Sequence, residues 1–133
     1  MSGINLETII ATIISVFAFL ISISCHEYAH GYVAYKLGDP TAKNSGRLSL
    51  NPLKHFDLVS ILFYLVFHFG WAKGVPIDPR YFKDRKKGMA LSALAGPVTN
   101  ILIAVISLVI LNLIYKIEFT SHIWYMVFTW GRL

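Results

Sequence analysis

Residues 8–35 read TIIATIISVFAFLISISCHEYAHGYVAY, and this stretch decides the fold. It holds no Lys, Arg or Asp, and its only acid is Glu27. As an α-helix it would be about 42 Å long, since each residue rises about 1.5 Å, and a bilayer core is about 30 Å thick. The stretch therefore predicts a membrane-spanning helix. We expect one helix over residues 6–37, ended by the turn signal Gly38-Asp39-Pro40.

Three further runs are almost free of charged residues: 58–72, 88–115 and 119–131. The run 88–115 is long enough to span, whereas the other two reach only about 22 and 20 Å as helices. The whole chain is 56% hydrophobic and 14% charged, against about 25% charged in soluble domains. These features predict an all-α integral membrane protein with about three transmembrane helices, forming a single domain over residues 1–133.

The basic residues gather in two loops. The loops at 36–57 and 73–87 hold ten of the twelve Lys and Arg residues. If both loops lie on one side of the bilayer, the positive-inside rule makes that side cytoplasmic, and 58–72 is re-entrant. If 58–72 crosses fully, the loops lie on opposite sides. We favour the re-entrant alternative because the segment is short. Since the bilayer explains the basic loops, we expect no nucleic-acid partner.

Two proline-containing stretches have weak strand character. Residues 46–53 and 74–79 alternate weakly in polarity, and proline in a strand is confined to edges. Short edge strands and irregular loops both fit these stretches.

The motif that carries chemistry is His26-Glu27-Tyr28-Ala29-His30, an H-E-x-x-H sequence inside the first predicted helix. Positions i and i+4 share a helix face, so both imidazoles can reach one metal ion. Glu27 can act as general base toward a water that zinc activates. Ionisable groups at membrane depth are costly and normally mark function. The pattern predicts metal-assisted peptide hydrolysis.

The sequence around this motif resembles the active-site helix of the site-2 protease family, which are intramembrane zinc metalloproteases. Three other segments resemble the family in the same order: GRLSLNPLKHFD at 46–57, GWAK at 70–73 and ALAGPVTN at 93–100. The resemblance covers roughly residues 20–112. The order and spacing of its segments are similar to those of the compact prokaryotic branch of the family. It implies that His26 and His30 bind Zn²⁺ and that Glu27 is the catalytic base.

The resemblance also implies that Asn100, after a Gly96-Pro97 helix break, lies near the catalytic centre. Freed backbone groups at such a break are tolerated only where they face protein or a wet cavity. Asn100 could donate to a substrate carbonyl or transition-state oxyanion, or it could form an interhelical hydrogen bond. Both roles stay open from the sequence.

The family's third zinc ligand is an Asp in a Leu-Asp-Gly motif on a later helix. These 133 residues contain no such motif and their last Asp is Asp84, so we expect the Asp-bearing helix to be lacking. A catalytic zinc normally has three protein ligands. Other side chains that could complete the site are Asp57, His55, His122, Glu118 and Cys25, of which Cys25 points about 100° around the helix from His26.

We therefore predict a membrane-embedded zinc metalloendopeptidase that cleaves transmembrane or membrane-proximal protein segments. Its partners would be that membrane protein or peptide substrate and the lipid bilayer, in a multi-pass protein of the bacterial inner membrane. The alternative is a truncated, inactive relative acting as a membrane scaffold or metal-holding remnant. The sequence does not indicate the oligomeric state.

Overall fold

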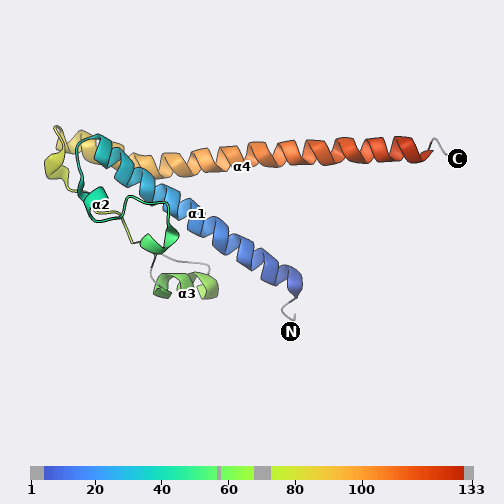
Figure 1. The fold of residues 1–133 in the computed structure, drawn as a ribbon, viewed down its shortest axis with the longest axis horizontal. Helices are drawn as coiled ribbons and strands as arrows, with labels where there is room; N and C mark the ends of the chain where they lie inside the picture. The colour runs from blue at the N-terminus through green and yellow to red at the C-terminus, as the bar shows by residue number, and fades with distance from the viewer. Residues whose placement is uncertain (1–4, 57, 68–72, 131–133) are drawn as a thin grey trace. The chain divides into compact units, whose positions relative to one another are not determined.

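The computed structural model describes residues 5–56, 58–67 and 73–130, and all regular structure in these ranges is helical. The helices are α1 (Leu6–Lys36), α2 (Thr41–Asn44), α3 (Leu58–Phe67) and α4 (Arg85–Trp130), with 3₁₀ turns η1 (Pro52–Lys54) and η2 (Pro79–Tyr81) (Figure 1). The chain divides into a first unit, residues 1–100, and a second unit, residues 101–133. The candidate site lies entirely in the first unit.

Helix α1 has the boundaries that the sequence predicts. Its first turn is capped by the Asn5 side chain, which accepts a hydrogen bond of 2.8 Å from the Thr8 N–H. Its other end is turned by Gly38, whose φ of +107° is open to glycine but strained for other residues. The expectation of one unbroken helix ending before Gly38-Asp39-Pro40 is confirmed.

Two helices in the described ranges are long and apolar enough to cross a bilayer: α1 and the Arg85–His122 part of α4. Helix α3 has 10 residues and is about 15 Å long, too short to cross as a helix. The runs 88–115 and 119–131, expected as separate segments, are joined in α4 up to Trp130. The prediction of about three spanning helices is therefore one too many for the described residues.

The predicted helix break at Gly96-Pro97 is wrong, because Pro97 lies inside continuous α4. Proline removes one N–H and crowds the carbonyl four residues earlier, which weakens a helix without always ending it. In membrane helices, contacts with neighbouring elements commonly re-satisfy the freed groups.

The edge-strand interpretation is also wrong, since residues 46–53 and 74–79 contain no strand. Asn51 accepts a hydrogen bond of 3.0 Å from the Leu53 N–H, which starts the η1 turn in place of a strand. In the second stretch, the N–H groups of Val75 and Asp78 donate to side-chain carboxylates, so they are not offered to a neighbouring strand. Irregular loops, the other reading of the sequence, describe both stretches.

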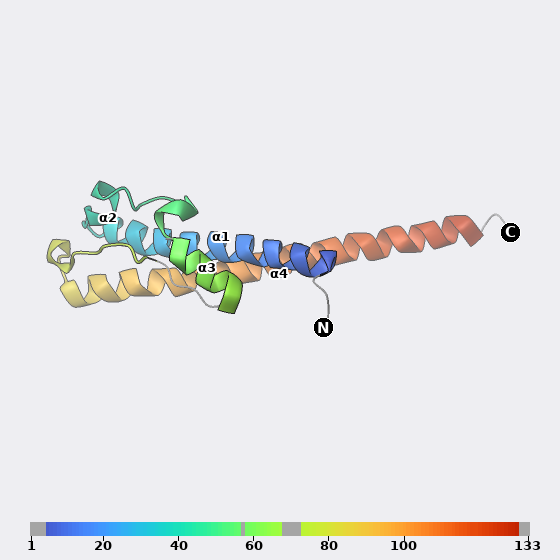
Figure 2. The same cartoon turned by 90° about the horizontal axis from the view of Figure 1, so that it is seen from below.

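The two basic loops touch each other. The Lys73 N–H donates to the His55 carbonyl at 2.7 Å, and the Arg47 guanidinium donates to the carbonyls of Lys73 and Gly74. His55 and Lys73, at the two ends of the intervening stretch, thus lie at adjoining points. Figure 2 shows α2 and its following loop beside the C-terminal end of α1.

Buried and exposed residues are distributed as in a protein solvated by lipid. Among the described residues, the buried side chains are small, polar or both in most cases: Ser24, Glu27, Ala34, Asp39, Ala42, His55, Phe82 and Ser92. Large apolar side chains of α1 and α4 are exposed, for example Phe17 at 62%. Polar groups thus gather inside and apolar groups outside, which suits a bilayer.

Candidate metal centre

His26 and His30 face each other on one side of α1. Their Nε2 atoms are 3.0 Å apart, and their ring centroids are 4.6 Å apart with the ring planes at 85°. The helix is unbroken through both residues, so the i, i+4 spacing brings the rings together. Two Nε2 atoms this close can share one proton or ligate one cation.

The far nitrogen of His30 fixes which ring nitrogen carries its proton. Nδ1 of His30 lies 2.6 Å from the carbonyl oxygen of Ser92 on α4. A carbonyl only accepts, so Nδ1 carries the hydrogen and donates it. Neutral His30 then presents a lone pair on Nε2, the form that a metal requires.

The far nitrogen of His26 contacts Asn100. The Asn100 Nδ2 group donates to Nδ1 of His26 at 3.0 Å, and the Ser22 hydroxyl donates to the Asn100 Oδ1 atom at 3.4 Å. His26 then carries its hydrogen on Nε2 and can donate it to His30. For His26 to ligate a metal through Nε2, that hydrogen must move to Nδ1, and the Asn100 amide must rotate so that Oδ1 accepts it. Asn100 thus forms the interhelical hydrogen bond, one of the two roles left open by the sequence.

The Gly96 backbone packs closely against both Nε2 atoms. A Cβ at residue 96 would lie 2.4 Å from Nε2 of His30 and 2.6 Å from Nε2 of His26. A side chain at residue 96 would therefore displace both rings. The two neighbouring Nε2 atoms and their Nδ1 partners fit a zinc ion as a two-histidine half-site.

Glu27 lies beside the histidines in a partly enclosed cavity. Its carboxylate is 8% exposed, and its Oε2 atom accepts a hydrogen bond of 2.9 Å from the Val75 N–H. The cavity has a volume of about 270 Å³ and is lined by Glu27, His30, Gly74, Val75, Ile77, Met89 and Ala93. That volume admits several waters or a short peptide segment next to the carboxylate.

No third ligand joins the pair among the described residues, in which no group of three His, Cys, Asp or Glu side chains could hold a metal. His55 is fully buried and its Nε2 lies 2.6 Å from the Ser49 carbonyl, so this side chain makes a hydrogen bond within its own loop. Cys25 lines a different, apolar groove with Tyr28 and Val98. Glu118 and His122 belong to the second unit, and Asp57 lies outside the described residues.

Sequence reasoning missed three contributors to the site. The Ser92 carbonyl and the Val75 N–H are backbone groups, which no residue pattern reveals. Gly96 was noticed only as half of a helix break, and its close approach to two imidazoles became visible in the folded chain.

Comparisons with known proteins give the chain its family. The chain is 45% identical over 100 residues to "Putative zinc metalloprotease YwhC" of Bacillus subtilis, covering 75% of this chain. The chain is a homologue of the site-2 protease family. A second relative of this homologue is "Putative zinc metalloprotease Rip2" of Mycolicibacterium smegmatis, 30% identical over 102 residues and 72% of this chain.

The site-2 protease homologue spans less than half of each of these relatives, 46% of the first and 39% of the second. No family model matches the chain. No solved structure matches it.

Proposed function

We propose that this chain provides the H-E-x-x-H half of a membrane-embedded zinc metalloendopeptidase that cleaves transmembrane or membrane-proximal protein segments. The observation that carries the proposal is the pair of Nε2 atoms 3.0 Å apart, with the Glu27 carboxylate beside them in a cavity. Homology to two proteins that carry the name "Putative zinc metalloprotease" supports the reaction class.

His26 and His30 would hold the zinc ion through Nε2. When bound there, zinc would polarise the scissile carbonyl and make a water molecule acidic enough to react at neutral pH. The Ser92 carbonyl keeps the His30 ring in the ligating form, and the Asn100 amide oxygen would do the same for His26. A third protein ligand completes a catalytic zinc site, and the family resemblance implies an Asp for that position.

Glu27 would act as the general base. Its Oε2 atom accepts the Val75 N–H, which holds the carboxylate in one orientation. The second carboxylate oxygen is then available to take a proton from water and deliver it to the leaving amine.

The substrate would be an extended segment of a membrane protein. The cavity is bordered by the irregular chain at Gly74–Ile77, which has no strand partner in the described ranges. Helices α1 and α4 would cross the bacterial inner membrane, with the two basic loops on the cytoplasmic side. The ten Lys and Arg residues of these loops would then contact lipid headgroups instead of nucleic acid.

The test is Glu27→Gln in the purified chain with a model transmembrane substrate. Glutamine keeps the shape and can still accept the Val75 N–H, but it cannot take a proton from water. We expect at least a 100-fold loss of cleavage, in line with general-base catalysis at about 10²–10⁴, with zinc content unchanged. Equal cleavage by wild type and Glu27→Gln would contradict the base assignment.

A further inference from the structure

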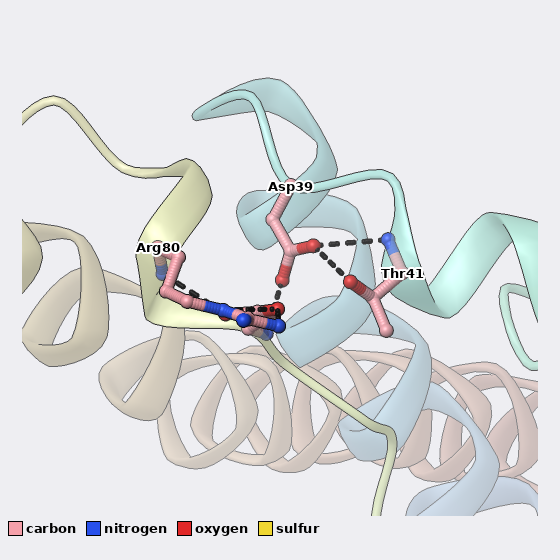
Figure 3. Close-up of polar contacts among 4 residues, drawn as sticks. Asp39, Thr41 and Arg80 are labelled. Carbon is pink, nitrogen blue, oxygen red and sulfur yellow. Dashed lines mark hydrogen bonds and ion pairs between the residues drawn. The ribbon is translucent and has the colours of Figure 1, made fainter.

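Asp39 is a buried carboxylate that the proposed chemistry does not use. It is fully buried just after α1, and both of its oxygens accept hydrogen bonds. Oδ1 accepts from the Thr41 N–H at 2.9 Å and from the Thr41 hydroxyl, which is a local Asx turn just before α2 (Figure 3). This turn needs only this one oxygen.

The second oxygen of Asp39 does something different. Oδ2 accepts a hydrogen bond of 2.7 Å from the backbone N–H of Asp78, which lies 39 residues away in sequence. Asp78 belongs to the irregular segment 74–78 that borders the cavity. Its own side chain is engaged by Arg80, and the guanidinium lowers the pKa of the Asp78 carboxyl to about 2. Arg80 is thus paired with Asp78, and the Asp39 carboxylate is held by hydrogen bonds.

The same segment is attached to α1 at two more points. The Val75 N–H donates to Glu27 at 2.9 Å, and the Val75 side chain packs over Gly31, where an added Cβ would lie only 3.0 Å from it. Segment 74–78 has no strand beside it in the described ranges, so carboxylates at both of its ends take the N–H groups that a neighbouring strand would otherwise accept.

We propose that Asp39 is a positioning residue that fixes segment 74–78 against α1, so that the Val75 N–H meets the Glu27 carboxylate. Asp39 contacts neither Glu27 nor the histidines in this arrangement and acts only through the segment. The inference deepens the proposed function, and it rests on that function for its catalytic meaning.

The test uses Asp39→Asn in the purified chain in detergent micelles. Asparagine forms the same Asx turn as aspartate, so its oxygen can keep Thr41, but its NH₂ group then faces the Asp78 N–H. We expect hydrogen–deuterium exchange at Val75 and Asp78 to accelerate at least about tenfold, while amides of α2 stay protected. Zinc content should be unchanged, and kcat should fall more than KM rises.

Two more variants separate positioning from the local turn. Thr41→Val removes only the hydroxyl bond of the turn, and we expect it to leave exchange at Val75 and Asp78 as in wild type. Asp39→Ser keeps an oxygen for the turn but is too short to reach Asp78, and it should behave as Asp39→Asn does, including where Asp39→Asn proves unstable.

The outcomes are distinct. Unchanged exchange at Val75 and Asp78 in both Asp39 variants overturns the inference, as does equal acceleration in Thr41→Val. The exchange comparison decides the role of Asp39 even if the wild-type chain cleaves nothing. Absence of cleavage in wild type counts against the proposed function alone.

Discussion

The two halves of α1 form one unbroken helix and have opposite surroundings. Over residues 6–21 most large side chains are exposed, with Ile14 and Phe17 both at 62%. From residue 24 onward, Ser24, Glu27, Gly31 and Ala34 are buried at spacings of three and four residues, which is one face of a helix. Hydrophobicity predicts that both halves enter a bilayer. Small and polar residues on one face decide which half packs against other elements and can carry a site.

The largest effect on zinc binding is expected from the substitution Gly96→Ala. The added Cβ would lie within 2.6 Å of both histidine Nε2 atoms, so the rings must move apart or the metal is excluded. We expect zinc affinity to fall by about 100-fold or more, at the upper end of the effect of disturbing a metal site. Zinc titration in detergent measures it.

Gly74→Ala is the matched control for that variant, because a Cβ at residue 74 meets nothing within 4 Å. Its zinc affinity should equal that of wild type. If both glycine variants bind zinc as wild type does, the two histidine rings beside Gly96 do not hold the metal.

A smaller effect is expected from Asn100, which contacts the buried half of α1. Asn100→Leu removes the partner of Nδ1 of His26, and we expect zinc affinity to fall about 10- to 100-fold. Asn100→Asp supplies an acceptor without any amide rotation and should bind zinc at least as well as wild type. Weaker binding by Asn100→Asp than by Asn100→Leu would argue that His26 does not ligate through Nε2.

The smallest expected effect concerns stability instead of the metal. Ala34 is fully buried, so Ala34→Leu should overpack the interface and cost about 1–3 kcal/mol. Ile14→Ala changes an exposed position in the other half of the helix and should stay within about 0.5 kcal/mol. Thermal unfolding in detergent compares the two variants, and a larger loss in Ile14→Ala would reverse our account of which half is packed.

Much of α1 could be predicted from the sequence because its signals are local. The length of the apolar run, the Gly38 turn and the His26–His30 spacing each depend on neighbouring residues alone. The break at Pro97 and the edge strands were wrong because they depend on what lies beside each segment, and the described residues contain two of the about three spanning helices expected. Pro97 is accommodated inside α4, and the N–H groups of Val75 and Asp78 find carboxylates that no strand pattern anticipates.

The side chains of the site could be predicted from the sequence, whereas the groups that hold them in place could not. His26, Glu27 and His30 stand together in sequence, so a motif reveals them. Ser92, Gly96 and Asn100 come from a helix some 60 residues later, and their roles depend on how α1 meets the first turns of α4 within the first unit. The Asp39 contact to Asp78 likewise joins two loops that are far apart in the sequence, so no local pattern reveals it.

The proposed zinc site lies on the packed half of α1, between His26 and His30. Its most direct test is the zinc content of the purified chain after dialysis, compared among wild type, His26→Ala and His30→Ala, with the exposed His122→Ala as matched control. We predict about one zinc per chain in wild type and His122→Ala and almost none in the other two variants, because each removes half of a two-histidine site. Wild-type zinc content in both His26→Ala and His30→Ala would contradict the account.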